Sequence, residues 1–302
     1  MQPREQRVQR LQPVRREPGR FFDGGGGGEP PDRDGPLRIA LERHVDGGGR
    51  ESFSLRRAVG YDDRRLGRLL VPADAGWRTD LTSVPWLLTW LVPRTGRHLP
   101  AALVHDGLVG GAADDPPSYV SEEGHLVARD EADRVFRDAM GDLGTGPVRR
   151  WLVWAAVTVA TIAVGSAAWS PRQRWHYRIA AGATVGLVLV LGALATLDLF
   201  DAGVRLPWMG DRPWPAELVG GFAGAVVIPS SLALTWGRFR VAGAISAVAL
   251  ALLLHVSVAL LLLTGLYQAT EVVVRRAPTV AAVVAAGVGV ASLVVVVGFV
   301  IG

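Results

Sequence analysis

Histidine and carboxylate side chains in three segments of the first half of the chain could form one polar cluster. His105 and Asp106 are adjacent, Asp80 lies upstream in a loop-like segment, and Arg129 and Asp133 are four residues apart downstream. A histidine with carboxylates can bind a divalent metal and activate water for hydrolysis. One histidine is a weak metal signature beside a His-Glu-x-x-His pattern. The pattern therefore favours a structural network, with a metal site and a partner-binding surface as the alternatives.

Two predicted helices must position these side chains. Residues 101–109 form a short apolar helix that carries His105, and residues 129–140 form an amphipathic helix with apolar residues at i, i+3 and i+4. On a helical wheel Arg129 falls inside the apolar stripe and Asp133 at its edge, so these two residues can meet on one face. Because an unpaired buried charge is costly, we expect an Arg129–Asp133 pair that converges with the His105 segment.

Short strand-like stretches precede these helices, so residues 37–147 are predicted to form one small α+β soluble domain. Residues 37–45, 53–59 and 69–71 have strand-like composition, with turn signals between them. Residues 1–36 are basic and rich in glycine and proline, which predicts a disordered arm. This arm lacks the apolar core of about 7–15 residues that a signal peptide requires, so we expect the domain to stay in the cytoplasm.

Four motifs in this domain carry a resemblance to a known family. They are Val71-Pro-Ala, Thr79-Asp-Leu-Thr-Ser-Val-Pro85, Ala101-Ala-Leu-Val-His-Asp106 and Arg129-Asp-Glu-Ala-Asp-Arg-Val-Phe136. In order and spacing they resemble the domain-of-unknown-function family numbered 1353, over about residues 50–170. That family is similar to small proteins common in tailed phages and prophages, so the resemblance implies a phage-derived domain and supplies no reaction. Gly107 and Trp86 depart from the family pattern, which usually has an aromatic and often a basic residue there.

The second half of the chain is predicted to be an all-α polytopic transmembrane domain. Four uncharged stretches are long enough to cross a hydrocarbon core, which needs about 20 helical residues; they are residues 179–197, 218–236, 241–267 and 277–302. Residues 179–302 are therefore assigned four transmembrane helices. Residues 148–178 contain either a closing helix of the soluble domain or a weak first span, followed by a basic loop. The distribution of loop arginines favours four spans over five and keeps the soluble domain cytoplasmic in both cases.

Within the predicted spans, His255 is the ionisable side chain that lies deep in the hydrocarbon region. Such a group is a functional candidate by default. Gly182 and Gly186, like Gly220 and Gly224, have the Gly-x-x-x-Gly spacing that lets helices approach closely, which suggests a homo-oligomer.

Composition narrows the function further. The chain has 302 residues and a formal net charge of only +4, with both signs interspersed, so we expect no nucleic-acid partner. Cysteine is absent, which excludes disulfides, thiolate catalysis and zinc–thiolate sites.

Together these features predict a docking protein rather than an enzyme. A phage-type cytoplasmic domain on a multi-span anchor would link a phage-tail-like contractile injection particle to the cytoplasmic (inner) membrane and support its contraction. This hypothesis rests on family context and architecture. Its partners are the lipid bilayer and components of the particle, and it needs no cofactor. The alternative is a membrane-tethered hydrolase that uses a divalent metal held by a cluster of His105, Asp106, Asp133 and Asp80.

Overall fold

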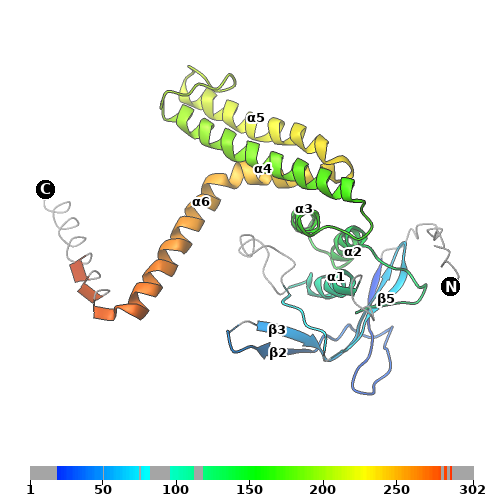
Figure 1. Ribbon diagram of the computed structural model, residues 1–302. Coiled ribbons are helices and arrows are strands. Elements are labelled where there is room, and N and C mark those ends of the chain that lie inside the picture. The colour runs from blue at the N-terminus through cyan, green and yellow to red at the C-terminus, as the bar shows by residue number, and fades with distance from the viewer. Residues whose placement is uncertain are drawn as a thin grey trace. The chain divides into compact units, whose positions relative to one another are not determined.

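The structure is a computed structural model, and it describes residues 19–49, 51–74, 76–81, 96–111, 118–279, 282–283 and 286–287. The chain divides into two compact units, Met1–Ala251 and Leu252–Gly302. The first unit holds a small domain of strands and helices, followed by long apolar helices (Figure 1). This order confirms the predicted fold class, an α+β domain followed by an all-α region.

An antiparallel sheet of four strands forms one layer of the α+β domain, and a separate hairpin of two strands lies between its first and second strands in sequence. The sheet has the order β1 (Arg20–Asp23), β4 (Val59–Asp63), β5 (Gly67–Val71) and β6 (Val120–Ser121). The hairpin consists of β2 (Leu41–Val45) and β3 (Glu51–Leu55).

The predicted strand over residues 53–59 is divided between β3 and β4 in the structure. The backbone changes partners at the division, because the Arg56 N–H donates to the Ala40 carbonyl while the Ala58 N–H donates to the Gly25 carbonyl. The strand predicted from residue 37 begins only at Leu41.

Strand β1 corrects the prediction that the chain is disordered as far as residue 36. β1 pairs with β4, and Asp23 at its end is fully buried. The Asp23 carboxylate accepts hydrogen bonds from Arg57 Nη2 and Arg38 Nε, each at 2.8 Å. These long-range contacts order a segment whose own apolar content is low. Residues 1–18 lie outside the described residues.

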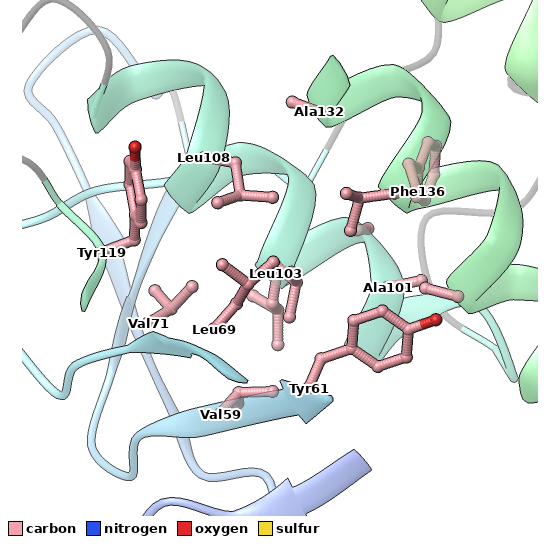
Figure 2. Close-up of a cluster of buried hydrophobic side chains, with 14 of the residues drawn as sticks. Val59, Tyr61, Leu69, Val71, Ala101, Leu103, Leu108, Tyr119, Ala132 and Phe136 are labelled. Atoms are coloured by element: carbon pink, nitrogen blue, oxygen red, sulfur yellow. The ribbon is translucent and has the colours of Figure 1, made fainter. Parts of the chain in front are cut away.

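Helices α1 (Leu99–Gly111) and α2 (Arg129–Asp142) cover the sheet. Figure 2 shows side chains of β4 and β5 meeting those of α1 and α2 in one cluster. The predicted apolar stripe of α2 is buried, with exposed fractions of 1% or less for Ala132, Val135, Phe136, Ala139 and Met140. Burying a large apolar side chain stabilises a fold by about 1.5–3 kcal/mol, so this face fixes the position of α2.

Helix α3 (Pro147–Val164) extends the same core. Val153 and Val157 belong to the buried cluster of the α+β domain. The Arg137 guanidinium of α2 lies over the rings of Trp151 and Trp154, at 5.1 and 5.3 Å from their centroids. Helix α3 therefore packs on the core of the α+β domain.

Further apolar helices follow α3. They are α4 (Pro171–Leu199), α5 (Trp214–Ala233), the 3₁₀ segment η2 (Leu234–Phe239) and α6 (Arg240–Arg276). Helices α4 and α5 lie side by side (Figure 1). Among the described residues, three helical segments are long and apolar enough to cross a membrane: Pro147–Val164, Pro171–Leu199 and Trp214–Val256.

The third of these segments contains two helices, because the backbone leaves helical geometry at Gly237 (φ 58°, ψ −120°) between α5 and α6. The predicted spans at 179–197, 218–236 and 241–267 thus fall on α4, on α5 with η2, and on α6. The predicted span at 277–302 lies almost entirely outside the described residues.

A second buried cluster joins these helices at one end. It consists of Ile162, Trp169, Tyr177, Ala180, Trp236 and Phe239. The cluster connects the end of α3, the start of α4 and η2, and it is the packed contact between the soluble domain and the apolar helices of the first unit.

Candidate functional site

Packing between α1 and α2 positions His105. Its ring stacks on the Phe136 ring of α2, with centroids 4.8 Å apart and an interplanar angle of 29°. The His105 residue is only 5% exposed. The apolar faces that bring the two helices together therefore also enclose a titratable side chain.

Carboxylates flank the His105 ring on both sides. The ring Nε2 lies 2.9 Å from Asp133 Oδ1, and Nδ1 lies 3.6 Å from Asp106 Oδ1. The Thr79 hydroxyl donates to Asp106 Oδ2 at 2.5 Å. Thr79 is itself fixed by two backbone hydrogen bonds with Phe53. We call Thr79, His105, Asp106 and Asp133 the His105 cluster.

The electrostatics of the cluster favour a charged histidine. Burial by itself lowers the pKa of His105, but the hydrogen bonds with Asp106 and Asp133 outweigh burial and raise this pKa to about 9. At neutral pH the ring is therefore an imidazolium between two carboxylates.

The structure thus brings together three of the predicted site residues, His105, Asp106 and Asp133. It does not pair Arg129 with Asp133: in the described part of the chain no ion pair joins them, and Arg129 Nε and Asp133 Oδ2 are buried without a hydrogen-bond partner. The physical reason is that His105 supplies the positive charge next to Asp133. Asp133 is buried, as expected, but its partner is His105 and not Arg129.

Two other predicted residues are exposed. Asp80 is exposed, and its neighbour Thr79 contacts Asp106. His255 lies on an exposed face of α6, in the unit Leu252–Gly302.

Within the described ranges, no group of three or more histidine, cysteine or acidic side chains could hold a metal ion. A cavity of about 630 Å³ occurs elsewhere, lined by residues 96–98 and 144–149 and by no member of the cluster. An ion network that contacts α1, α2 and the Thr79 segment is suited to holding them together.

The buried ion pair between Arg134 and Asp63 was not predicted from the sequence. Arg134 of α2 makes a two-pronged contact with Asp63 of β4, with Nη2–Oδ1 at 2.7 Å and Nη1–Oδ2 at 3.1 Å. The guanidinium also contacts Glu131 and Asp138, one turn away on either side. The sequence shows Glu131 and Asp138 at helical spacing from Arg134. It does not show that Asp63, which is 71 residues away, is also a partner.

Comparison with known proteins identifies a family that part of the chain resembles. The model of a family described as "Protein of unknown function (DUF1353)" matches residues 53–157. The matched segment runs from β3 into α3 and contains both the His105 cluster and the Arg134–Asp63 pair, which confirms the resemblance seen in the motifs. It ends among the α3 residues that pack on the domain core. No curated protein and no solved structure matched the chain.

Proposed function

We propose that the protein links a phage-tail-like contractile injection particle to the cytoplasmic membrane and supports contraction of the particle there. One observation carries this proposal: a DUF1353-type domain and helices apolar enough to span a membrane are joined in one chain. The phage-type resemblance supports the particle as the partner of the domain, and the apolar helices supply the anchor.

Contacts between the domain and the apolar helices support a particular topology. Arg238 of η2 lies 3.0 Å from Asp130 at the start of α2, and the Ser166 hydroxyl donates to the same carboxylate at 3.1 Å. These contacts support a topology in which the connections before α4 and after α5 lie on the same side of the membrane as the soluble domain. If α3 crossed the bilayer, Asp130 and Arg238 would lie on opposite sides.

Helix α3 is therefore assigned to the soluble domain, and the membrane anchor begins in α4. At this connection Arg178 Nη2 of α4 donates to the carbonyls of Ala163 and Val164, which ties the start of α4 to the end of α3. The side of the soluble domain also carries more arginines than the α4–α5 connection, which favours the cytoplasm. These are Arg172, Arg174, Arg178, Arg238 and Arg240, against Arg205 and Arg212.

A reporter fused after Arg178 tests the topology. With α3 packed on the domain, the fusion should report the cytoplasm, as should a fusion after Phe239. A reporter fused at Gly203, in the connection between α4 and α5, should report the opposite side. An external signal after Arg178, with the soluble domain inside, would show that α3 spans the membrane.

The docking role is tested by deleting the gene and imaging the particles in cells. Particles should still assemble but should lie free in the cytoplasm, and contraction at the membrane should be lost. The full chain should restore attachment. A chain that ends at residue 170 keeps the domain core but lacks the anchor, so it should not restore attachment. Normal attachment in the deletion strain would refute the proposal.

A further inference from the structure

Arg238 lies where the connection between α5 and α6 meets the soluble domain. Its guanidinium is 4.8 Å from the ring centroid of Phe239, 5.5 Å from that of Trp169 and 5.8 Å from that of Tyr177. A cation over aromatic faces is attracted by their negative π-clouds. We call these three rings the aromatic seat.

The three rings of the aromatic seat come from three segments of the chain. Trp169 belongs to the connection between α3 and α4, Tyr177 to the first turns of α4 and Phe239 to η2. The rings also pack on one another, with centroid distances of 4.9–5.4 Å. The seat is therefore a formed surface that positions the guanidinium toward α2.

Asp130 is the anionic partner of Arg238. It lies in the first turn of α2, where a negative charge also interacts favourably with the helix dipole. One of its oxygens accepts a hydrogen bond from Ser166, and the other faces Arg238. A single carboxylate thus ties together α2, the α3–α4 connection and η2.

Gly237 supplies a bend directly beside Arg238. Its backbone (φ 58°, ψ −120°) is strained for any residue with a Cβ. A Cβ at this position would make only ordinary contact, 3.9 Å from Tyr177. Glycine is therefore required for the backbone conformation rather than for space, which is the property of a turning point between two helices.

The contact between Asp130 and Arg238 can hold the soluble domain against η2 and can also break. The Arg238 side chain is 49% exposed, and half-exposed ion pairs and cation–π contacts are individually weak. The core of the soluble domain lies in a different cluster from the aromatic seat. Losing the Asp130–Arg238 contact would therefore leave that core intact.

We propose that Asp130 and Arg238 form a releasable latch between the soluble domain and the α5–α6 connection. When the latch is closed, the domain is seated on η2. When the domain is pulled, the ion pair separates before either folded part unfolds, and the α5–α6 connection turns about Gly237. This inference rests on the proposed function only for the source of the pull, the attached particle.

Distance measurement on the full chain in lipid nanodiscs tests the latch without any particle. The chain has no cysteine, so spin labels attach only where cysteines are introduced. We would label exposed positions on the two sides, with Leu126→Cys next to α2 and Thr235→Cys in η2, and record pulsed EPR distances. The unaltered latch should give one narrow, short distance distribution.

Two variants remove the latch in different ways. Asp130→Asn keeps the shape of the side chain and the hydrogen bond with Ser166 but loses the charge, and Arg238→Ala removes the cation. Both should reduce the short-distance population and broaden the distribution. The matched control is Arg240→Ala, which removes an equal charge two residues away and should leave the distribution unchanged.

An unchanged distribution in both latch variants would overturn the proposal, as would an equal loss in Arg240→Ala. Because no particle is present, this result is independent of the docking experiment. Failure of the latch would leave the docking proposal standing, and failure of docking would leave the latch as a measured property of the chain.

Discussion

The soluble domain and the apolar helices place the same kinds of side chain in opposite surroundings. In the domain, Leu103 and Leu108 are fully buried. In the helices, Val190 is 56% exposed and Phe222 is 63% exposed. Exposed apolar surface on this scale is stable only against lipid or another apolar partner. The difference shows that one chain uses the hydrophobic effect internally in its first part and against the bilayer in its second.

Polar groups differ between the two regions as well. The domain buries charges in pairs, Asp63 with Arg134 and Asp133 with His105. In the apolar helices, hydroxyl groups such as Thr196 and Thr264 donate to carbonyls of their own helix, and the buried contact between helical segments is Trp236 with Thr184. Breaking a polar contact should therefore have a large effect in the domain and a small one among the helices.

Arg134→Ala should produce the largest effect. The substitution leaves the fully buried Asp63 carboxylate without its guanidinium, which costs about 3–5 kcal/mol for a buried pair. We expect this loss in the free energy of unfolding of the domain. It can be measured by native-state hydrogen exchange of α1 and α2 amides in the full chain.

Arg65→Ala is the matched control for that measurement. Arg65 is exposed in the turn between β4 and β5, so its removal should change stability by no more than about 0.5 kcal/mol. Equal protection in Arg134→Ala and the unaltered chain would show that the domain does not depend on its buried charges.

His105→Gln should produce the next largest effect, and this effect should depend on pH. The pKa of His105 rises from 6.5 in the unfolded chain to about 9 in the folded domain. The contribution of the imidazolium is thus fully present below pH 6.5 and is lost as pH rises through about 9. The shift corresponds to about 3 kcal/mol at roughly 1.4 kcal/mol per pKa unit.

The measurement compares the unfolding free energy of the unaltered chain and of His105→Gln between pH 6 and pH 10. The stability difference should shrink as pH rises, because the unaltered chain loses a contribution that glutamine never makes. His44→Gln is the control, since His44 lies in the β2–β3 hairpin and contacts Ser54. A difference that is constant with pH would mean that the pKa of His105 does not change when the domain folds.

The contrast between the soluble domain and the apolar helices also explains how much of the structure could be predicted from the sequence. The apolar helices were predictable because long uncharged stretches need no tertiary partner to be recognised. The amphipathic stripe of α2 and the neighbouring residues of the family motifs also predicted the placement of His105, Asp106 and Asp133 in one cluster.

Pairing over long separations was not predictable. The wheel placed Arg129 near Asp133, but the charge beside Asp133 comes from α1, and the partner of Arg134 comes from β4. Likewise, β1 is ordered by contacts of Asp23 with Arg38 and Arg57, which composition does not reveal. Local periodicity indicates which face of an element is buried. Which charged side chain faces that buried surface depends on how elements far apart in the chain are arranged.

Thr184→Val should produce the smallest effect and tests the helical side of the comparison. The Thr184 hydroxyl accepts a hydrogen bond from Trp236 Nε1 at 2.9 Å, and both residues are buried. Side-chain hydrogen bonds between membrane helices contribute on average about 0.6 kcal/mol, because alternative partners exist in the unfolded state. Unfolding of the full chain in mixed micelles with increasing SDS, followed by circular dichroism, should show a loss of about that size. Thr264→Val is the control and should leave the transition unchanged, since its hydroxyl bonds only within α6. A loss as large as that of Arg134→Ala would mean that the helices, like the domain, depend on specific buried polar contacts, and the contrast between the two regions would fail.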